Sequence, residues 1–499
     1  MQPGGFTATT TRTRIRPRRR TPWAGRRAVI VIKNAFWLSV CRIAADCSGL
    51  VLFTVISRRL GPASTGEYSY AFALGGFIAI LAASGLDQYG VRQYSRLRSL
   101  SEQTACWQGM LGVQALQLLC GIALLWIAVL FLGGRNASPT VIVELSIFLI
   151  GWGLSRTFFV PAIAREQMAV PAFIELTCRA AASLSALTLC LLGVTSLAWI
   201  LIAFPVAGVA LAGLAFGNAT RYGARFRFGS SWRDVAAVAR HAAPFTLCEG
   251  LGQFYIRADL LLIVYLLGTA SAGWYAADLK IVEVGVMPLI LLGTAAYPML
   301  SRTAVQDRAG FHALSEEYLR AVLFVSGWLA VGMFWLIPLL IPALFGDRFE
   351  PAARLLPIFS LLALTKGLEI ALYRLLYATR RQNTYLAALL LGTVLIVALN
   401  LWLIPLFGTG GAIATVVLST AVVDLVAMRS LSPELPASMF ALAMARLALP
   451  LVGTALVVAG LRASGLKDWY VAGGACLAFP VLGYVCGLVP RPSRSLLFA

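Results

Sequence analysis

The chain has 499 residues, of which 59% are hydrophobic and only 12% are charged, and its mean hydropathy is +0.82. About a quarter of the residues of a soluble globular protein are charged, so this composition excludes an ordinary soluble enzyme or binding module. The formal net charge of +20 does not indicate a nucleic-acid partner, because an excess of Lys and Arg in a membrane protein marks its cytoplasmic loops.

Residues 1–28 come before the first apolar span and are rich in Arg, Thr and Pro. They show no apolar periodicity, so we expect a basic, disordered tail on the cytoplasmic side. An alternative role for the Arg-rich run at 12–20 is electrostatic binding to anionic lipid. No short apolar core followed by a small-residue cleavage site is present, so the segment is not expected to be a cleavable signal peptide.

Spans of about 20 mostly apolar residues, the length that crosses a bilayer as a helix, recur along the rest of the chain. We count fourteen, at roughly 34–57, 69–91, 105–132, 140–161, 171–192, 195–217, 243–267, 273–300, 319–345, 354–377, 383–405, 409–428, 438–460 and 469–489. They predict an all-α polytopic membrane protein with about 14 transmembrane helices. If the tail is cytoplasmic and the loops alternate, the cytoplasmic side carries 26 Lys and Arg and the opposite side seven. Both termini are therefore expected in the cytoplasm.

One nine-residue sequence occurs twice. Residues 60–68 and 267–275 are identical at six of nine positions, at an offset of 207, and each copy links two apolar spans. A repeat at this distance indicates two homologous halves, the architecture of many secondary transporters, whose substrate sites lie between the halves. Because six helices return the chain to its starting side, we expect parallel repeats related by a pseudo-two-fold axis along the membrane normal.

The expected division of the chain follows from the repeat. It comprises the tail, a six-helix N-lobe at 29–218, a basic cytoplasmic linker at 219–242, a six-helix C-lobe at 243–430 and an appendage of two helices at 431–499. The two helices of the appendage have no counterpart in the first half.

Eighteen charged residues fall inside the predicted spans. The basic ones are Arg42, Arg156, Arg179, Arg257, Lys280, Lys366, Arg374 and Arg446. The acidic ones are Asp46, Asp87, Glu144, Glu175, Glu249, Asp259, Asp278, Glu283, Glu369 and Asp424. A charge at the bilayer centre costs about 2.5–3.5 kcal/mol, so these groups are expected to face one another or a watery cavity rather than lipid.

The repeat sharpens this expectation. An offset of 207 superimposes Arg42 on Glu249 and Asp46 on Gln253. Arg42 and Asp46 are four residues apart, and Glu249, Gln253 and Arg257 follow one face of the seventh span. Two equivalent helices thus carry polar stripes on equivalent faces, which predicts that both line a central cavity between the halves. The alternative is a self-contained Arg42–Asp46 ion pair.

The tenth span carries a third polar stripe. Its members are Lys366, Glu369, Tyr373, Arg374 and Tyr377. Arginine is suited to phosphate because it offers a fixed fork of donors and keeps its charge. The in-span charges sum to minus two, however, and in-span carboxylates are equally suited to bind Na⁺ or a proton, so composition alone does not establish an anion cavity.

No motif for enzymatic chemistry is found in the sequence. It lacks a GxxxxGK[ST] phosphate loop, an HExxH zinc motif and a GxSxG sequence with a placed base. Nine cysteines without a CxxC pair, together with only two histidines, predict neither a disulfide framework nor a metal site. We expect no catalysis, no ATP hydrolysis and no cofactor; the energy would come from an ion gradient, with Na⁺ or H⁺ as the coupling ion, from the membrane potential or from the substrate gradient.

A set of short motifs, in this order along residues 33–430, resembles the polysaccharide-biosynthesis (Wzx-type, oligosaccharide flippase) branch of the multidrug/oligosaccharidyl-lipid/polysaccharide (MOP) exporter superfamily. The motifs are Lys33-Asn34, Arg59-Leu60-Gly61-Pro62, Gly66-Glu67-Tyr68, Ser84-Gly85-Leu86, Arg92, Pro244-Phe245, Arg257 with Asp259, Gly273-Trp274-Tyr275, Tyr297-Pro298, Leu344-Phe345-Gly346, Arg348-Phe349, Leu355-Leu356-Pro357, Asn400, Leu403-Ile404-Pro405 and residues 408–415.

The resemblance implies a two-lobed fold like that of the MATE multidrug exporters. It also implies alternating-access transport of undecaprenyl-pyrophosphate-linked oligosaccharide from the cytoplasmic to the periplasmic leaflet of a bacterial inner membrane, for export of a surface polysaccharide. The implied partners are this lipid-linked oligosaccharide, membrane lipids and polysaccharide polymerase or export machinery. The implied substrate contacts are Arg42 and Arg257 first, then Arg156, Arg374, Lys366 and Gln253. The candidates for ion coupling or charge pairing are Asp46, Glu249, Asp259 and Glu369.

Three alternatives remain open on the sequence. A cation-coupled drug exporter of the same superfamily would have an acidic cavity and structural arginines. A membrane-embedded glycan polymerase or ligase would need a sizeable extracytoplasmic loop, and the predicted loops on that side are short. A non-transporting partner of a glycan assembly complex would not need Arg42 or Arg257.

Overall fold

The computed structural model describes residues 22–83, 85–97, 99–132, 137–222 and 232–489. Within these ranges the regular elements are helices, and no strand occurs. Most of the expected disordered tail, and residues 223–231 of the expected linker, lie outside the described residues. Helix α1 begins at Pro22, so residues 22–28 of the expected tail are helical.

The first half of the chain forms an N-lobe. Its helices are α1 (Pro22–Leu60), α2 (Pro62–Ala83), α3 (Leu86–Tyr94), α4 (Leu100–Leu132), α5 (Pro139–Phe158), α6 (Val160–Ile163), α7 (Ala169–Leu191), α8 (Leu197–Leu201) and α9 (Ala203–Arg221). Helix α5 packs between α2 and α9, and α1 packs against α7.

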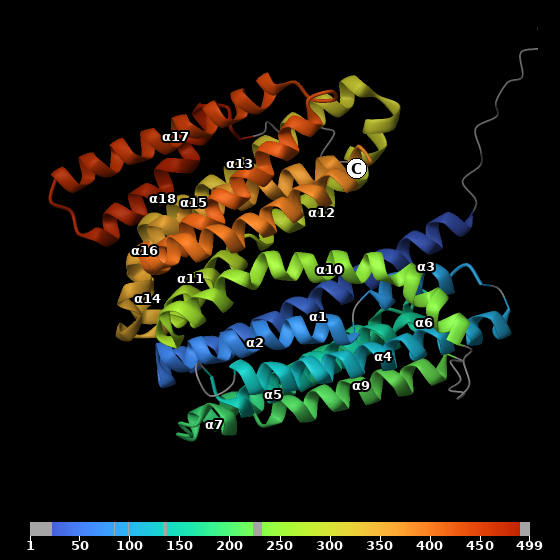
Figure 1. The fold of residues 1–499 in the computed structure, drawn as a ribbon. Helices are drawn as coiled ribbons and strands as arrows, with labels where there is room; N and C mark the ends of the chain where they lie inside the picture. The colour runs from blue at the N-terminus through green and yellow to red at the C-terminus, as the bar shows by residue number, and fades with distance from the viewer. Residues whose placement is uncertain (1–21, 84, 98, 133–136, 223–231, 490–499) are drawn as a thin grey trace, which may run out of the picture.

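The second half forms a C-lobe with two further helices beside it. Its elements are α10 (Trp232–Leu267), α11 (Thr269–Gly285), α12 (Met287–Gln306), α13 (Arg308–Val331), the π-helical turn η1 (Gly332–Leu336), α14 (Ile337–Phe345), the 3₁₀ turn η2 (Asp347–Phe349), α15 (Glu350–Ala378) and α16 (Gln382–Leu431). The further helices are α17 (Ala437–Ala463) and α18 (Asp468–Val485). They pack against each other and against α13 and η1, on the outer side of the C-lobe (Figure 1).

Twelve helical stretches of the described chain are long and apolar enough to cross a membrane. The longest, α16, has 50 residues and is broken at Gly408, whose φ of 58° and ψ of −140° are open mainly to glycine. Each part of α16 matches one predicted span, and α18 matches the last. The break therefore divides one of the twelve stretches into two, which accounts for thirteen of the fourteen predicted spans; α18 occupies the place of the last but is not among the twelve.

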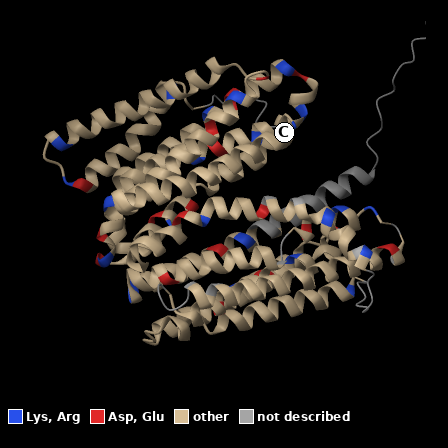
Figure 2. Ribbon diagram, in the orientation of Figure 1, with Lys and Arg blue, Asp and Glu red and all other residues tan. Residues whose placement is uncertain are grey.

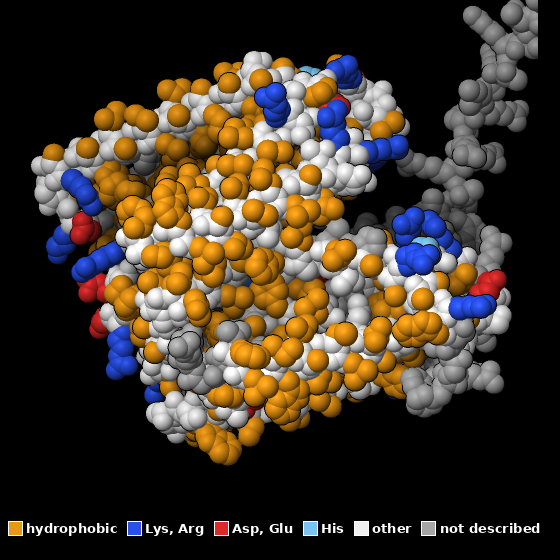
Figure 3. All heavy atoms as spheres, viewed as in Figure 1, with side chains coloured by type: hydrophobic (Ala, Val, Ile, Leu, Met, Phe, Trp, Pro, Cys, Tyr) orange, Lys and Arg blue, Asp and Glu red, His pale blue; other side chains and the backbone are white. Residues whose placement is uncertain are grey.

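The two lobes converge at one end of the molecule and diverge at the other (Figure 1). We call the first the closed end; it contains the connections at Gly61 and Gly268. The opposite end, which contains the connections at Asp307 and 432–436, is the open end. Figure 3 shows the surface hollowed between the lobes toward the open end. In Figure 2 the charged residues lie mostly near helix ends, and a smaller set lies along the middle of helices between the lobes.

The apolar core follows the same division. Around the closed end, one continuous cluster of buried side chains joins both lobes, from Phe53 and Leu145 to Tyr275 and Phe359. Toward the open end the buried side chains form separate clusters. One contains Trp107 of α4 and the first half of α10. The other joins α12, α13 and α15 to α17 and α18. Helix α10 therefore packs with the N-lobe along its first half, whereas Tyr255 in its second half packs against α16.

Candidate functional site

The two copies of the repeated sequence meet at the closed end. A Cβ atom on Gly66 would lie 1.8 Å from the carbonyl oxygen of Thr269, and a Cβ on Gly273 would lie 2.0 Å from that of Pro62. Gly66 and Gly273 are equivalent in the repeat, and so are Pro62 and Thr269. The contact is thus reciprocal, as a pseudo-two-fold axis between α2 and α11 requires, and glycine allows the two backbones to touch.

Side chains add to this closure. The Arg58 guanidinium of α1 donates a hydrogen bond of 2.9 Å to the carbonyl oxygen of Ala343 in α14. Within the C-lobe, the Trp274 indole of α11 donates one of 3.1 Å to the carbonyl oxygen of Arg348, which fixes η2 beside this contact. The rings of Phe53 and Phe345 meet edge to face. Backbone, polar and aromatic contacts therefore all hold the lobes together at this end.

Arg156 of α5 makes an ion-pair network that reaches α10. Its Nη2 and Nε atoms donate to Asp87 Oδ2 of α3, at 2.6 and 3.0 Å, and its Nη1 donates to Glu249. The three side chains are only 18–26% exposed. The sequence placed Arg156 and Glu249 in the site, but its helical spacing gave no reason to add Asp87, because the three residues come from different helices.

Arg42 and Asp46 do not pair with each other. Asp46 instead accepts a hydrogen bond of 2.8 Å from Arg179 of α7. Arg179 also donates to Glu175, at 3.4 Å, and Glu175 accepts a bond of 2.8 Å from the Trp152 indole. Arg42 is exposed and bonds to none of the described residues. The predicted stripe on α1 is therefore split into an engaged carboxylate and an unengaged guanidinium.

The polar stripe on α10 points to several neighbours. Arg257 forms a 2.8 Å ion pair with Glu283 of α11, which also accepts a bond of 3.0 Å from Lys280. Gln253 is exposed and has no hydrogen-bond partner among the described residues. Asp259, on a different face from Arg257, is buried at 3% exposure and accepts a hydrogen bond from the Tyr275 hydroxyl.

The polar residues of α15 contact two different neighbouring helices, α10 and α12. Lys366 donates a hydrogen bond of 2.6 Å to Glu369, and its ammonium lies 4.7 Å from the ring centroid of Tyr255 on α10. Arg374 donates a bond of 3.0 Å to the Thr294 hydroxyl of α12. Arg374 also lies over the rings of its neighbours Tyr373 and Tyr297. The tenth span thus supplies two separate polar groups.

The structure therefore sorts the predicted cations by their partners. Arg156, Arg257 and Lys366 are each paired with a carboxylate. Arg42, on the N-lobe, and Arg374, on the C-lobe, have no carboxylate partner among the described residues. The last two are the predicted cations best suited to receive an anion.

Two buried carboxyl groups also stand out, Asp278 on α11 and Asp424 on α16. They are 0% and 2% exposed, and neither oxygen of either group has a hydrogen-bond partner within the described structure. The sequence identified both as in-span acids but could not select them, because burial without a partner depends on the packing of other helices.

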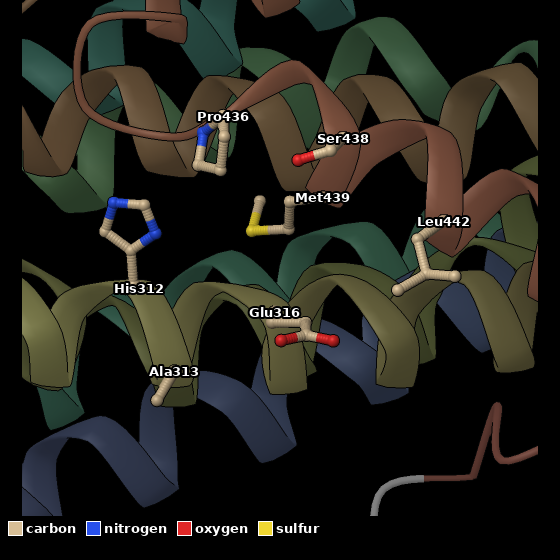
Figure 4. A pocket seen from close by; sticks show the side chains of 7 residues that line it. All are labelled: His312, Ala313, Glu316, Pro436, Ser438, Met439 and Leu442. Atoms are coloured by element: carbon tan, nitrogen blue, oxygen red, sulfur yellow. The ribbon is translucent and has the colours of Figure 1, made fainter.

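A pocket of about 290 Å³ lies away from the lobe boundary, between α13 and α17 (Figure 4). Its lining includes His312, Glu316, Ser438 and Met439, none of which the sequence singled out. Glu316 is held by Arg320 and by Arg446 of α17. Among the described residues, no group of three or more His, Cys, Asp or Glu side chains is arranged to hold a metal ion.

Comparisons with known proteins agree with the two-lobed arrangement. A sequence profile of the family described as "polysaccharide biosynthesis protein" matches residues 31–304, more than half of the chain. No curated protein sequence matches the chain significantly.

Several solved structures share the fold. The structure of the lipid II flippase MurJ in an inward closed conformation aligns with a TM-score of 0.71 at 13% identity, covering 90% of this chain and 97% of MurJ. An inward-facing multidrug resistance MATE transporter of the MOP superfamily aligns with a TM-score of 0.56 at 13% identity. The alignment covers 77% of this chain and 92% of the transporter. A MOP superfamily transporter from Pyrococcus furiosus aligns with a TM-score of 0.50 at 12% identity. The alignment covers 80% of this chain and 93% of that transporter. At these identities the likeness shows the fold alone.

Proposed function

The chain belongs to the polysaccharide biosynthesis protein family of the MOP superfamily, and from this premise we propose that it flips undecaprenyl-pyrophosphate-linked oligosaccharide across a bacterial inner membrane. It would do so by alternating access, as a secondary transporter rather than an enzyme, for export of a surface polysaccharide. The similarity to a lipid II flippase supports a lipid-linked substrate. The fold of two lobes around a hollow supports transport between them (Figure 3).

The observation that carries the proposal is a pair of arginines that lack a carboxylate partner: Arg42, which bonds to none of the described residues, and Arg374, which bonds to a hydroxyl and lies over two tyrosine rings. Arg42 on α1 and Arg374 on α15 come from opposite lobes, and neither has a carboxylate partner among the described residues. A cation within a membrane span is costly unless an anion or water compensates it. A pyrophosphate offers several acceptor oxygens that match the guanidinium fork, so the substrate itself would supply the missing partner.

The remaining candidate residues take supporting roles in this scheme. Arg257 and Arg156 would reach the pyrophosphate only by exchanging Glu283 or Glu249 for it, and Lys366 only by exchanging Glu369. Gln253, which is exposed on α10, would contact the sugar. Asp46, Glu249, Asp259 and Glu369 would hold neighbouring groups in place or take part in ion coupling.

The orientation follows from charge. The Lys and Arg residues of the loops on the open-end side, such as Arg96, Arg165, Arg308 and Arg380, outnumber those at the closed end. We assign the open end and both termini to the cytoplasm. In this state the hollow would receive substrate from the cytoplasmic leaflet, while the repeat-on-repeat contact closes the periplasmic side.

The first test is the lipid-linked saccharide profile of a deletion strain, measured together with its surface polysaccharide. We expect the undecaprenyl-linked unit to accumulate on the cytoplasmic leaflet and the polymer to be lost, with both defects reversed by the wild-type gene. Unchanged glycans combined with a loss of drug efflux would instead support the cation-coupled drug exporter.

Variants then test the site. Loss of a charge-assisted hydrogen bond costs about 1.5–3 kcal/mol, so Arg42→Ala and Arg374→Ala should each lower export about tenfold or more. Arg257→Ala should do so as well if the pyrophosphate displaces Glu283. Arg354→Ala is the matched control, because Arg354 is largely exposed and, among the described residues, its ion pair is with Glu350 of its own helix. Wild-type export by well-inserted Arg42 and Arg374 variants would refute the assignment.

A further inference from the structure

Asp424 lies in the second part of α16, inside the C-lobe. Its side chain is 2% exposed, and neither carboxyl oxygen has a hydrogen-bond partner in the described structure. One helical turn earlier, the Thr420 hydroxyl is already engaged, at 3.2 Å, with the Tyr255 hydroxyl of α10. A carboxyl group of this kind is stable only when its charge is removed or matched.

The groups that face Asp424 come from neighbouring helices. Tyr255 of α10 bonds to Thr420, one turn before Asp424, and its ring lies 4.7 Å from the Lys366 ammonium of α15, which binds Glu369. These contacts bring Lys366 and Glu369 to the surroundings of Asp424. From the first part of α16, Tyr385 lies near Glu369 and Tyr255. Helices α11 and α17 also touch α16, but their described residues contribute no charged group that acts on Asp424.

The charges in this cluster do not balance if Asp424 is ionised. The ammonium of Lys366 is matched by Glu369, its hydrogen-bond partner at 2.6 Å. If Asp424 were ionised, two carboxylates, Glu369 and Asp424, would share the single positive charge of Lys366. A bound proton removes this imbalance without any further ligand. The side chains of Lys366 and Glu369 are 24% and 9% exposed, whereas Asp424 is 2% exposed, so burial increases from the lysine to the aspartate.

Helix α10 connects this cluster to the lobe boundary. It bears Glu249, which binds Arg156 of the N-lobe, and six residues later Tyr255, which contacts Lys366 and Thr420 of the C-lobe. Between them, a Cβ on Gly252 would meet no atom within 4 Å, so the helix is little packed at that position, whereas one on Gly250 would touch Ile80 of α2. A movement of the lobes that shifts α10 would therefore change the surroundings of Lys366 and Asp424.

We propose that Asp424 is a proton-binding site of the C-lobe, protonated when the closed end is shut and deprotonated in the opposite conformation. On release the proton leaves to water, and Lys366 becomes shared between Glu369 and the Asp424 carboxylate. The link to a transport cycle rests on the proposed function, but the proton site and its coupling to the lobes do not require the substrate to be known.

The proton site is tested first by infrared difference spectroscopy of the full-length protein in lipid nanodiscs, recorded as the pH is changed. We expect a protonated-carboxyl C=O band that shifts in D₂O and loses intensity as the pH rises. Asp424→Asn should abolish this titrating band. Asp278→Asn is the matched control, because Asp278 is equally buried and unpartnered but no charged side chain of the described residues acts on it. The proposal fails if Asp424→Asn leaves the titrating band intact, or if Na⁺ at constant pH removes it.

Coupling to the lobes is tested by spin labels at Ser64 and Ser271, equivalent positions of the repeat at the closed end. They are introduced into a cysteine-free variant. Allosteric coupling typically changes populations by about fivefold or more, and we expect raised pH to populate a longer distance by at least this factor. Asp424→Asn should keep the short distance at every pH, whereas Asp278→Asn should respond like the parent. A pH response unchanged by Asp424→Asn would overturn the coupling. Neither experiment uses oligosaccharide, so a failure of the flippase assignment would show separately, in the glycan profile.

Discussion

The two ends of the lobe boundary are built differently. At the closed end, glycine brings the backbones of α2 and α11 into contact, and one apolar cluster runs through both lobes. Toward the open end the apolar clusters are separate, and α10 changes its neighbours from the N-lobe to the C-lobe along its length. A dry contact of small residues depends on shape and tolerates little change. A helix shared between lobes, with an ion pair at its middle, allows its surroundings to rearrange.

The largest effect is expected where the backbones touch. Gly66→Ala and Gly273→Ala would each place a methyl group about 2 Å from a carbonyl oxygen of the facing helix. Overpacking typically costs about 1–3 kcal/mol, which corresponds to a roughly 5–150-fold shift away from the closed end. We expect a longer Ser64–Ser271 spin-label distance and a loss of export.

Gly76→Ala on the same helix is the control, because a methyl group placed on Gly76 would have no atom within 4 Å. It should behave like the parent protein. If Gly66→Ala matched Gly76→Ala in both measurements, the repeat contact would not be the closure of this end.

Much of the fold could be predicted from the sequence, because its signals are local. The apolar spans predict the membrane-crossing helices, and the recurrence of residues 60–68 at 267–275 predicts the division into two halves. What the sequence could not supply was the contact between the two copies. A repeat shows that Gly66 and Gly273 are equivalent, but only the packing of α2 on α11 shows that they lie at one interface.

The site was less predictable for a related reason. Spacing along one helix correctly put Lys366 beside Glu369, since a pair three residues apart shares a face. For Arg42 and Asp46, four residues apart on α1, the structure excludes the alternative of a self-contained ion pair, because Arg179 of another helix is the partner of Asp46. The pairing of Asp87 with Arg156 likewise depends on tertiary packing.

An intermediate effect is expected from the Arg156 network, whose two carboxylates lie on different helices. Glu249 lies on α10, which continues into the C-lobe, whereas Asp87 lies on α3 of the N-lobe. Removing a partner of a partly buried pair costs about 1–2 kcal/mol here, less than the 3–5 kcal/mol of a fully buried one. Glu249→Gln should therefore shift the spin-label distance distribution.

Asp87→Asn should instead lower thermal stability by a similar amount and leave that distribution nearly unchanged. Equal distance shifts from both variants would show that the network does not distinguish the lobe boundary from the interior of the N-lobe.

The smallest effect is expected at Gly252, in the part of α10 where its neighbours change. No atom lies within 4 Å of a methyl group placed on Gly252, so Ala meets no steric conflict there. Alanine in a helix interior is favoured over glycine by about 0.5–1 kcal/mol, so Gly252→Ala should raise the melting temperature slightly. If α10 must flex as the lobes exchange, the same variant should lower the export rate a few-fold while the resting spin-label distance stays short. Higher stability with an unchanged rate would mean that α10 moves as a rigid rod, and the difference between the two ends would then lie in their contacts alone.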